Sequence, residues 1–89
     1  YVASKGAVGA LVRWFARVGA PRNVLVNGVA PGPIDTRMIA GRPVNMAAIP
    51  VGRIGAPDEI AAPIAFLCSP AASYVCGAML DVNGGVYMN

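Results

Sequence analysis

Two short apolar segments separated by a helix-like segment constrain the fold of this chain more than any other feature. Residues 24–30 form an apolar, β-branched run typical of a strand buried on both faces, and Pro31-Gly32-Pro33 ends it abruptly. Residues 78–82 form a second short strand, with a predicted helix between the two. A strand, a helix and a strand in this order form a crossover of a parallel sheet. The sequence therefore predicts an α/β fold built on a parallel sheet.

Residues 1–19 carry the pattern of a helix with two apolar rows. The first row comprises Val8, Val12 and Phe15, and the second comprises Ala7, Leu11, Trp14 and Val18. One row would cover the sheet, and the other would contact a further helix, for example in a second subunit. Gly19 and Pro21 should end this helix.

A second helix should open at Pro57-Asp58-Glu59, because proline suits a helix start and acidic residues favour the first turn. It should run to about Cys68, where Ser69-Pro70 closes it. Pro63 lies inside this range, and an interior proline removes a backbone hydrogen bond at a cost of about 3 kcal/mol. We therefore expect a kink or a later start.

The composition indicates that the chain does not cover its own apolar surface. Hydrophobic residues make up 56% of the chain and charged residues 12%, against roughly 25% charged residues in an average domain. A core-rich small domain is one interpretation. Because two parallel strands do not form a stable sheet in water, we favour part of a larger domain, an oligomer interface, or both. The missing strands would come from upstream sequence or from a partner chain.

Charge and cysteine content exclude several classes of function. The net charge is +3, and six arginines and one lysine are scattered, whereas a nucleic-acid site needs a basic stripe. Every apolar run is too short to span a membrane. Cys68 and Cys76 form no metal motif and there is no histidine, so we expect no metal site and buried cysteines in a reducing cytoplasm.

Tyr1 and Lys5 are four residues apart, so a helix would place both side chains on one face. A nearby ammonium lowers the pKa of a phenol by favouring its ionised form. Such a tyrosine can donate a proton to a carbonyl oxygen or accept one from an alcohol. The spacing alone is weak support, because many helices contain this pair by chance.

Four motifs together resemble the short-chain dehydrogenase/reductase family over nearly the whole chain. Residues 1–7 are similar to its YxxSK active-site helix, and residues 26–36 to its VNxVxPGxxxT segment. Residues 52–61 and 77–85 are similar to its two closing signatures. Within the family, the chain looks like the 3-oxoacyl-(acyl-carrier-protein) reductases and the related glucose and sugar-alcohol dehydrogenases.

The resemblance implies a fold and a site. It implies the C-terminal part of one Rossmann-type, doubly wound NAD(P)-binding domain, in which Tyr1 is the catalytic acid and base. Lys5 would lower the pKa of Tyr1 and bind the nicotinamide ribose. The turn at Pro31 and Gly32 would lie against the nicotinamide, the Ile34 main chain would pair with its carboxamide, and the Thr36 hydroxyl would contact carboxamide or phosphate. An ordinary strand-ending turn is the alternative for Pro31-Gly32.

The implied function is an NADP- or NAD-dependent oxidoreductase acting on a ketone or secondary alcohol, with NADP favoured. The resemblance also implies a homotetramer or homodimer assembled through the first helix and the C-terminal strand. The family's glycine-rich phosphate turn and catalytic serine lie upstream of Tyr1, so we expect these 89 residues alone to be inactive. The alternative is a noncatalytic structural or interaction piece.

The segment between Thr36 and Pro57 corresponds to a substrate lid in the family and is shorter than expected. Its larger apolar side chains are Met38, Ile39, Met46 and Ile49. They would either form an apolar substrate wall or pack the segment onto the core, and the sequence leaves both interpretations open.

Overall fold

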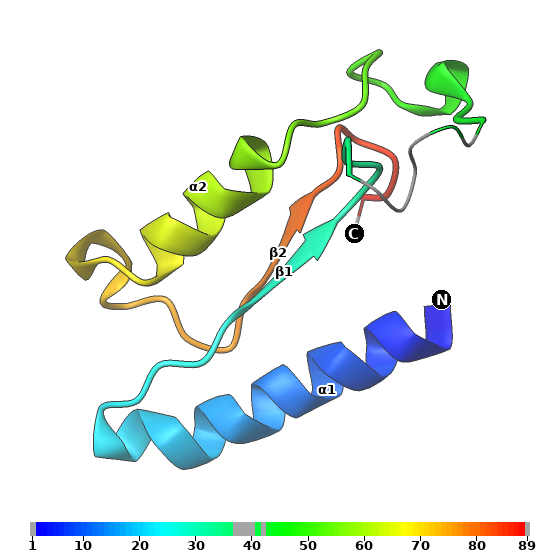
Figure 1. Ribbon diagram of the computed structural model, residues 1–89. Coiled ribbons are helices and arrows are strands. Elements are labelled where there is room, and N and C mark those ends of the chain that lie inside the picture. Colours follow the sequence, from blue (N-terminus) through cyan, green and yellow to red (C-terminus); the bar gives the residue numbers. More distant parts are fainter. Residues whose placement is uncertain (1, 37–40, 42, 89) are drawn as a thin grey trace.

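The computed structural model describes residues 2–36, 41 and 43–88. Two strands, β1 (Gly28–Pro31) and β2 (Met79–Val82), pair in parallel, with Gly28 opposite Met79 and Pro31 opposite Val82. Helix α1 (Val2–Gly19) lies on one side of this pair and α2 (Asp58–Leu67) on the other (Figure 1). The layers are therefore helix, sheet and helix, which confirms the predicted α/β class with parallel strands.

Helix α1 confirms the predicted helix, but the prediction that one apolar row covers the sheet is wrong: of the first row only Val12 is buried, while Val8 and Phe15 are each 50% exposed. Its buried positions are Gly9, Val12 and Ala16, which share one face of a helix. The helix ends at Gly19, as predicted, and a short 3-10 helix (Ala20–Arg22) follows. Small side chains on this face let the helix approach the strands closely.

The first strand is shorter than predicted and begins later, at residue 28 instead of 24. The Asn27 side chain accepts a hydrogen bond from the Ala78 N–H at 3.0 Å and donates one to the Val75 carbonyl at 2.9 Å. The Gly77 N–H already donates to the Val26 carbonyl at 2.8 Å, but the Ala78 N–H is taken by the Asn27 side chain, so the regular ladder starts only at Gly28. Pro31 extends the strand by one residue, because in this register its missing N–H faces away from β2.

The prediction that this strand is buried on both faces is wrong for the chain by itself. Val24 is 54% exposed and Leu25 39%, and only Ala30 is buried in β1. Among the described residues the sheet contains two strands, which leaves one edge of β1 without a neighbouring strand. The second strand, predicted at 78–82, is confirmed at 79–82.

Helix α2 begins at Asp58, with Pro57 at its N-cap, and ends at Leu67, close to the predicted bounds. The later start that Pro63 made us expect does not occur, because the helix begins at residue 58 and includes Pro63. The proline removes the hydrogen bond that an N–H at this position would donate to the Glu59 carbonyl. The rest of the helix tolerates that single loss. A 3-10 helix (Pro70–Ala72) follows α2.

The segment before α2 packs against the C-terminal turn. It contains a 3-10 helix (Met46–Ala48), and Ile49 is only 4% exposed. A Cβ on Gly84 would lie 3.0 Å from Ile49 Cγ2, and the Val51 N–H donates to the Gly84 carbonyl. Ile49 therefore packs onto the core, whereas Met46 is 45% exposed. Met38 and Ile39 lie outside the described residues.

The core of the described chain is thin, and much apolar surface is open to solvent. The large hydrophobic residues exposed on α1 are Val8, Leu11, Trp14, Phe15 and Val18, each between 49% and 58% exposed. Trp14 and Phe15 contact each other edge to face, with ring centroids 4.9 Å apart. The composition correctly predicted more apolar surface than these residues cover.

Candidate functional site

Lys5 lies near the N-terminal end of α1, and its side chain reaches Asp81 near the carboxyl end of β2. Its Nζ lies 3.2 Å from Asp81 Oδ1 in β2, and 3.9 Å from the centroid of the Tyr87 ring. The Lys5 side chain is 24% exposed and that of Asp81 18%. The ammonium is therefore held between a carboxylate and an aromatic face. Tyr1, the other predicted catalytic residue, lies outside the described residues.

A groove beyond the carboxyl end of β1 brings the other predicted site residues together. Its lining is Pro31, Gly32, Pro33, Ile34, Thr36, Pro57 and Ile60, around a cavity of about 460 Å³. Pro57 and Ile60 come from the start of α2 and form its second wall. Lys5 is not part of this lining, because it lies on the α1 side of the sheet. Open parallel sheets bind ligands at this position, beyond the carboxyl ends of their strands.

The main chain at Ile34 is oriented by a bridge to Gly55. The Gly55 N–H donates to the Pro33 carbonyl at 3.0 Å, and the Asp35 N–H donates to the Gly55 carbonyl at 2.8 Å. In a parallel bridge of this kind, the polar groups of the central residue point to the opposite side. The Ile34 N–H and carbonyl therefore face away from Gly55, and within the described chain they have no hydrogen-bond partner.

Gly32 has a structural role that is independent of any ligand. Its N–H donates to the Val82 carbonyl at 3.0 Å, and an added Cβ would lie 2.6 Å from the Cβ of Asn83. The close approach of two backbone segments therefore requires glycine here. An ordinary strand-ending turn is therefore enough to explain why residue 32 is glycine. This explanation is compatible with a ligand groove beside the turn.

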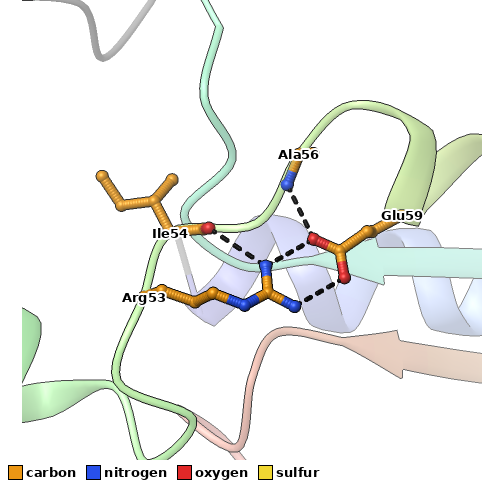
Figure 2. A network of polar contacts seen from close by, with 4 residues as sticks. All are labelled: Arg53, Ile54, Ala56 and Glu59. Atoms are coloured by element: carbon orange, nitrogen blue, oxygen red, sulfur yellow. Dashed lines mark hydrogen bonds and ion pairs between the residues drawn. The ribbon is translucent and has the colours of Figure 1, made fainter.

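An ion pair fixes the turn that forms the α2 wall of the groove. Arg53 binds the Glu59 carboxylate through both terminal nitrogens, at 2.6 and 2.8 Å, and the Ala56 N–H donates to the same carboxylate at 3.0 Å (Figure 2). The Arg53 hydrogen bonds and then the Ala56 N–H lower the pKa of Glu59 to about 2, and Glu59 raises that of Arg53. The carboxylate returns to the backbone before its own helix, much as in a capping box.

No cluster of three or more histidine, cysteine or acidic side chains able to hold a metal ion occurs in residues 2–36, 41 and 43–88. Over the same part of the chain, no helix combines the length and the apolar character needed to cross a membrane.

Comparison with known proteins gives the family. A family model described as Enoyl-(Acyl carrier protein) reductase matches residues 1–87. Among solved structures, the short-chain dehydrogenase/reductase SDR:Glucose/ribitol dehydrogenase from Brucella melitensis superposes with a TM-score of 0.88 at 47% identity. That match covers 98% of this chain and 37% of the other. The chain belongs to the short-chain dehydrogenase/reductase family.

The curated relatives of this short-chain dehydrogenase/reductase are longer proteins. The 3-oxoacyl-[acyl-carrier-protein] reductase FabG of Vibrio cholerae is 46% identical over 93 residues, which cover 99% of this chain and 38% of that enzyme. The galactitol 2-dehydrogenase (L-tagatose-forming) of Cereibacter sphaeroides is 50% identical over 92 residues, which cover 96% and 36%. The chain therefore spans little more than a third of the length of these relatives.

Sequence reasoning missed four residues of the candidate site, although signals existed for three of them. Asp81 is a charged residue inside an apolar strand, which is unusual unless the charge has a partner. Pro57 and Ile60 are three residues apart at a helix start, so they share one face. Tyr87 carries no sequence signal for its contact with Lys5, because the fold of the C-terminal turn decides it.

Proposed function

We propose that this chain is the C-terminal part of the catalytic domain of an oxidoreductase that transfers a hydride between a nicotinamide cofactor and a ketone or secondary alcohol. A 3-oxoacyl thioester is the proposed substrate, because a relative at 46% identity is a 3-oxoacyl-[acyl-carrier-protein] reductase. A 50% identical relative is a galactitol 2-dehydrogenase, so a sugar alcohol is the alternative substrate. Family membership supports the reaction type.

The groove beyond β1 carries the proposal. Its apolar wall of prolines and isoleucines suits a flat aromatic ring, and its volume of about 460 Å³ leaves room for one. The Ile34 N–H and carbonyl, turned away from Gly55, offer the donor and acceptor that a carboxamide needs. Thr36 adds a hydroxyl at the same groove. The residues present therefore fit the nicotinamide end of NADP or NAD.

The acid and base chemistry is assigned to Tyr1 and Lys5. Tyr1 would donate its phenolic proton to the carbonyl oxygen during reduction and accept it back from the alcohol during oxidation. Lys5 would favour the ionised phenol through its charge and bind the cofactor ribose. The cofactor, when bound, supplies or accepts the hydride. We assign NADP as the cofactor, with NAD as the alternative, and the remaining cofactor contacts to sequence upstream of this chain.

Assembly of the whole protein is proposed to use α1 and the C-terminal strand. The apolar stripe on α1, formed by Val8, Leu11, Trp14, Phe15 and Val18, lies away from the sheet-facing positions and is half exposed. Covering such a stripe removes apolar surface from water, which favours association. A homotetramer or a homodimer would bury it against the same helix of a second subunit. The prediction of buried cysteines is wrong for this chain by itself, because Cys68 and Cys76 are both exposed. Both are free thiols, which supports the proposal of a cytoplasmic enzyme.

Calorimetry tests the proposed function through cofactor binding. We expect the whole protein that contains this chain to bind NADP or NAD, and the 89-residue chain alone not to bind, because it provides only the nicotinamide end of the site. In the whole protein, Tyr1→Phe should abolish turnover and leave the cofactor affinity nearly unchanged. Full turnover by Tyr1→Phe would refute the assignment of the acid and base.

A noncatalytic interaction piece is the second candidate. The half-exposed apolar stripe on α1 and the two-stranded sheet favour it, because both need a partner whether or not the chain takes part in catalysis. The two candidates differ in one result. A whole protein that assembles through α1 but binds neither cofactor would support the interaction piece.

A further inference from the structure

Lys5 has two partners in the C-terminal part of the chain, and the geometry of the fold dictates the first. Helix α1 runs antiparallel to β2: Ala16 Cβ lies 3.5 Å from a Cβ built on Gly77, and Met79 Cγ lies 3.9 Å from one built on Gly9. From Gly9 to Lys5 the helix advances about 6 Å, and from Met79 to Asp81 the strand advances about 6.6 Å, so Lys5 comes opposite Asp81. The observed ion pair occupies this position.

The ion pair with Asp81 restricts the position of the Lys5 ammonium. The Lys5 and Asp81 side chains are 24% and 18% exposed, so water screens their attraction less than at an open surface. A lysine side chain has four rotatable bonds, and a carboxylate at 3.2 Å restricts the ammonium to a small region. Asp81 also makes at least one other interaction, which further fixes its own position.

The second partner reaches Lys5 through the turn after β2. Asn83 shapes this turn, because its Oδ1 accepts from the Gly85 N–H at 2.9 Å and its Nδ2 donates to the Tyr87 carbonyl at 2.9 Å. The turn brings the Tyr87 ring to 3.9 Å from Lys5 Nζ, well inside the roughly 6 Å range of a cation–π contact. The ammonium is thus bounded by a carboxylate and by an aromatic face.

We propose that Asp81 and Tyr87 are positioning residues for Lys5, so that the C-terminal turn sets where the ammonium stands relative to Tyr1 and the cofactor ribose. This inference rests on the proposed function of Tyr1 and Lys5. Asp81 also offsets part of the positive charge that Lys5 presents to its surroundings. Neither positioning residue contacts the reacting atoms.

The test uses Asp81→Asn in the whole protein, with Asp58→Asn as the matched control. Asp58 is an exposed carboxylate on α2, on the opposite side of the sheet (Figure 1). We expect Asp81→Asn to weaken cofactor binding in calorimetry roughly twofold to tenfold, since an unrestrained lysine must be ordered on binding. The pH at which alcohol oxidation rises should also move down by roughly half a pH unit to one unit, because less negative charge opposes ionised Tyr1. Asp58→Asn should change neither quantity.

The pair Tyr87→Leu and Tyr87→Phe tests the second contact and does not depend on Asp81→Asn folding. Tyr87→Leu should weaken cofactor binding roughly twofold to fivefold, while Tyr87→Phe, which keeps the ring face, should match the wild type. An unshifted pH profile with unchanged cofactor affinity in Asp81→Asn and Tyr87→Leu would overturn the inference. If these variants are silent while Tyr1→Phe is inactive, only the positioning role fails. If Tyr1→Phe is fully active, the proposed function fails first.

Discussion

Replacing Gly32 by alanine should destabilise the protein through a backbone collision. The new Cβ would lie 2.6 Å from the Cβ of Asn83 and 2.7 Å from its Cα, and the latter belongs to a backbone that follows directly on β2. Relief requires the two segments to separate, which breaks the hydrogen bond from the Gly32 N–H to the Val82 carbonyl. Overpacking costs about 1–3 kcal/mol and the hydrogen bond about 1 kcal/mol. We expect the free energy of unfolding to fall by about 2–4 kcal/mol.

Gly6→Ala is the matched control for this prediction. Gly6 lies inside α1, and an added Cβ would meet nothing within 4 Å. Alanine is favoured over glycine in a helix interior, so this variant should gain about 0.5–1 kcal/mol. Urea unfolding of the whole protein, followed by circular dichroism, measures both changes. A Gly32→Ala variant as stable as the wild type would refute the steric argument, because the 2.6 Å approach would then be relieved at no cost.

Three further predictions follow from the described contacts. The carboxylate of Glu59 has a pKa of about 2 in the folded chain against 4.5 ordinarily, so its stabilising contribution is present above about pH 4.5 and lost as the pH falls towards 2. Thermal melts should therefore show a smaller acid-induced loss in Glu59→Gln than in the wild type; equal losses would contradict the role of the Arg53 pair. Asn27→Ala removes two hydrogen bonds, of 2.9 and 3.0 Å, and should lower the free energy of unfolding by about 1–3 kcal/mol in urea titrations. A loss below about 0.5 kcal/mol would show that water replaces both bonds. Trp14→Arg puts a charge into the α1 stripe and should reduce the mass of the whole protein in light scattering, whereas an unchanged mass would contradict the proposed interface.

Local patterns predicted the elements of the fold well, and long-range hydrogen bonds decided their ends. The apolar spacing of residues 1–19 and the acidic start at residue 58 were enough to place α1 and α2. The start of β1 was predicted too early, because the side chain of Asn27 bonds to Val75 and Ala78, far along the chain. No local pattern around residue 27 reports a partner about fifty residues away.

For the candidate site, too, the sequence predicted which residues take part, and the tertiary structure decided which contacts they make. The four motifs pointed to Lys5 and to the residues of the groove, and the structure brings Pro31, Gly32, Ile34 and Thr36 to one cavity. The assigned roles of these residues, and that of Tyr1, stay predictions. The sequence did not reveal that Gly32 is required by the close approach of Asn83, because a glycine after a strand is equally typical of an ordinary turn.

By itself, the sequence determined the parallel α/β arrangement, the family, and an excess of apolar surface over what the chain can cover. These follow from periodicity, motif order and composition, which are local or additive properties of a chain. Only the tertiary structure decided which groups surround the Lys5 ammonium. Asp81 and Tyr87 lie about eighty residues from Lys5 in the sequence and reach it because α1 packs antiparallel to β2 and the turn at Asn83 reverses the chain. Such contacts depend on the register between packed elements, and that register is a property of the assembled fold.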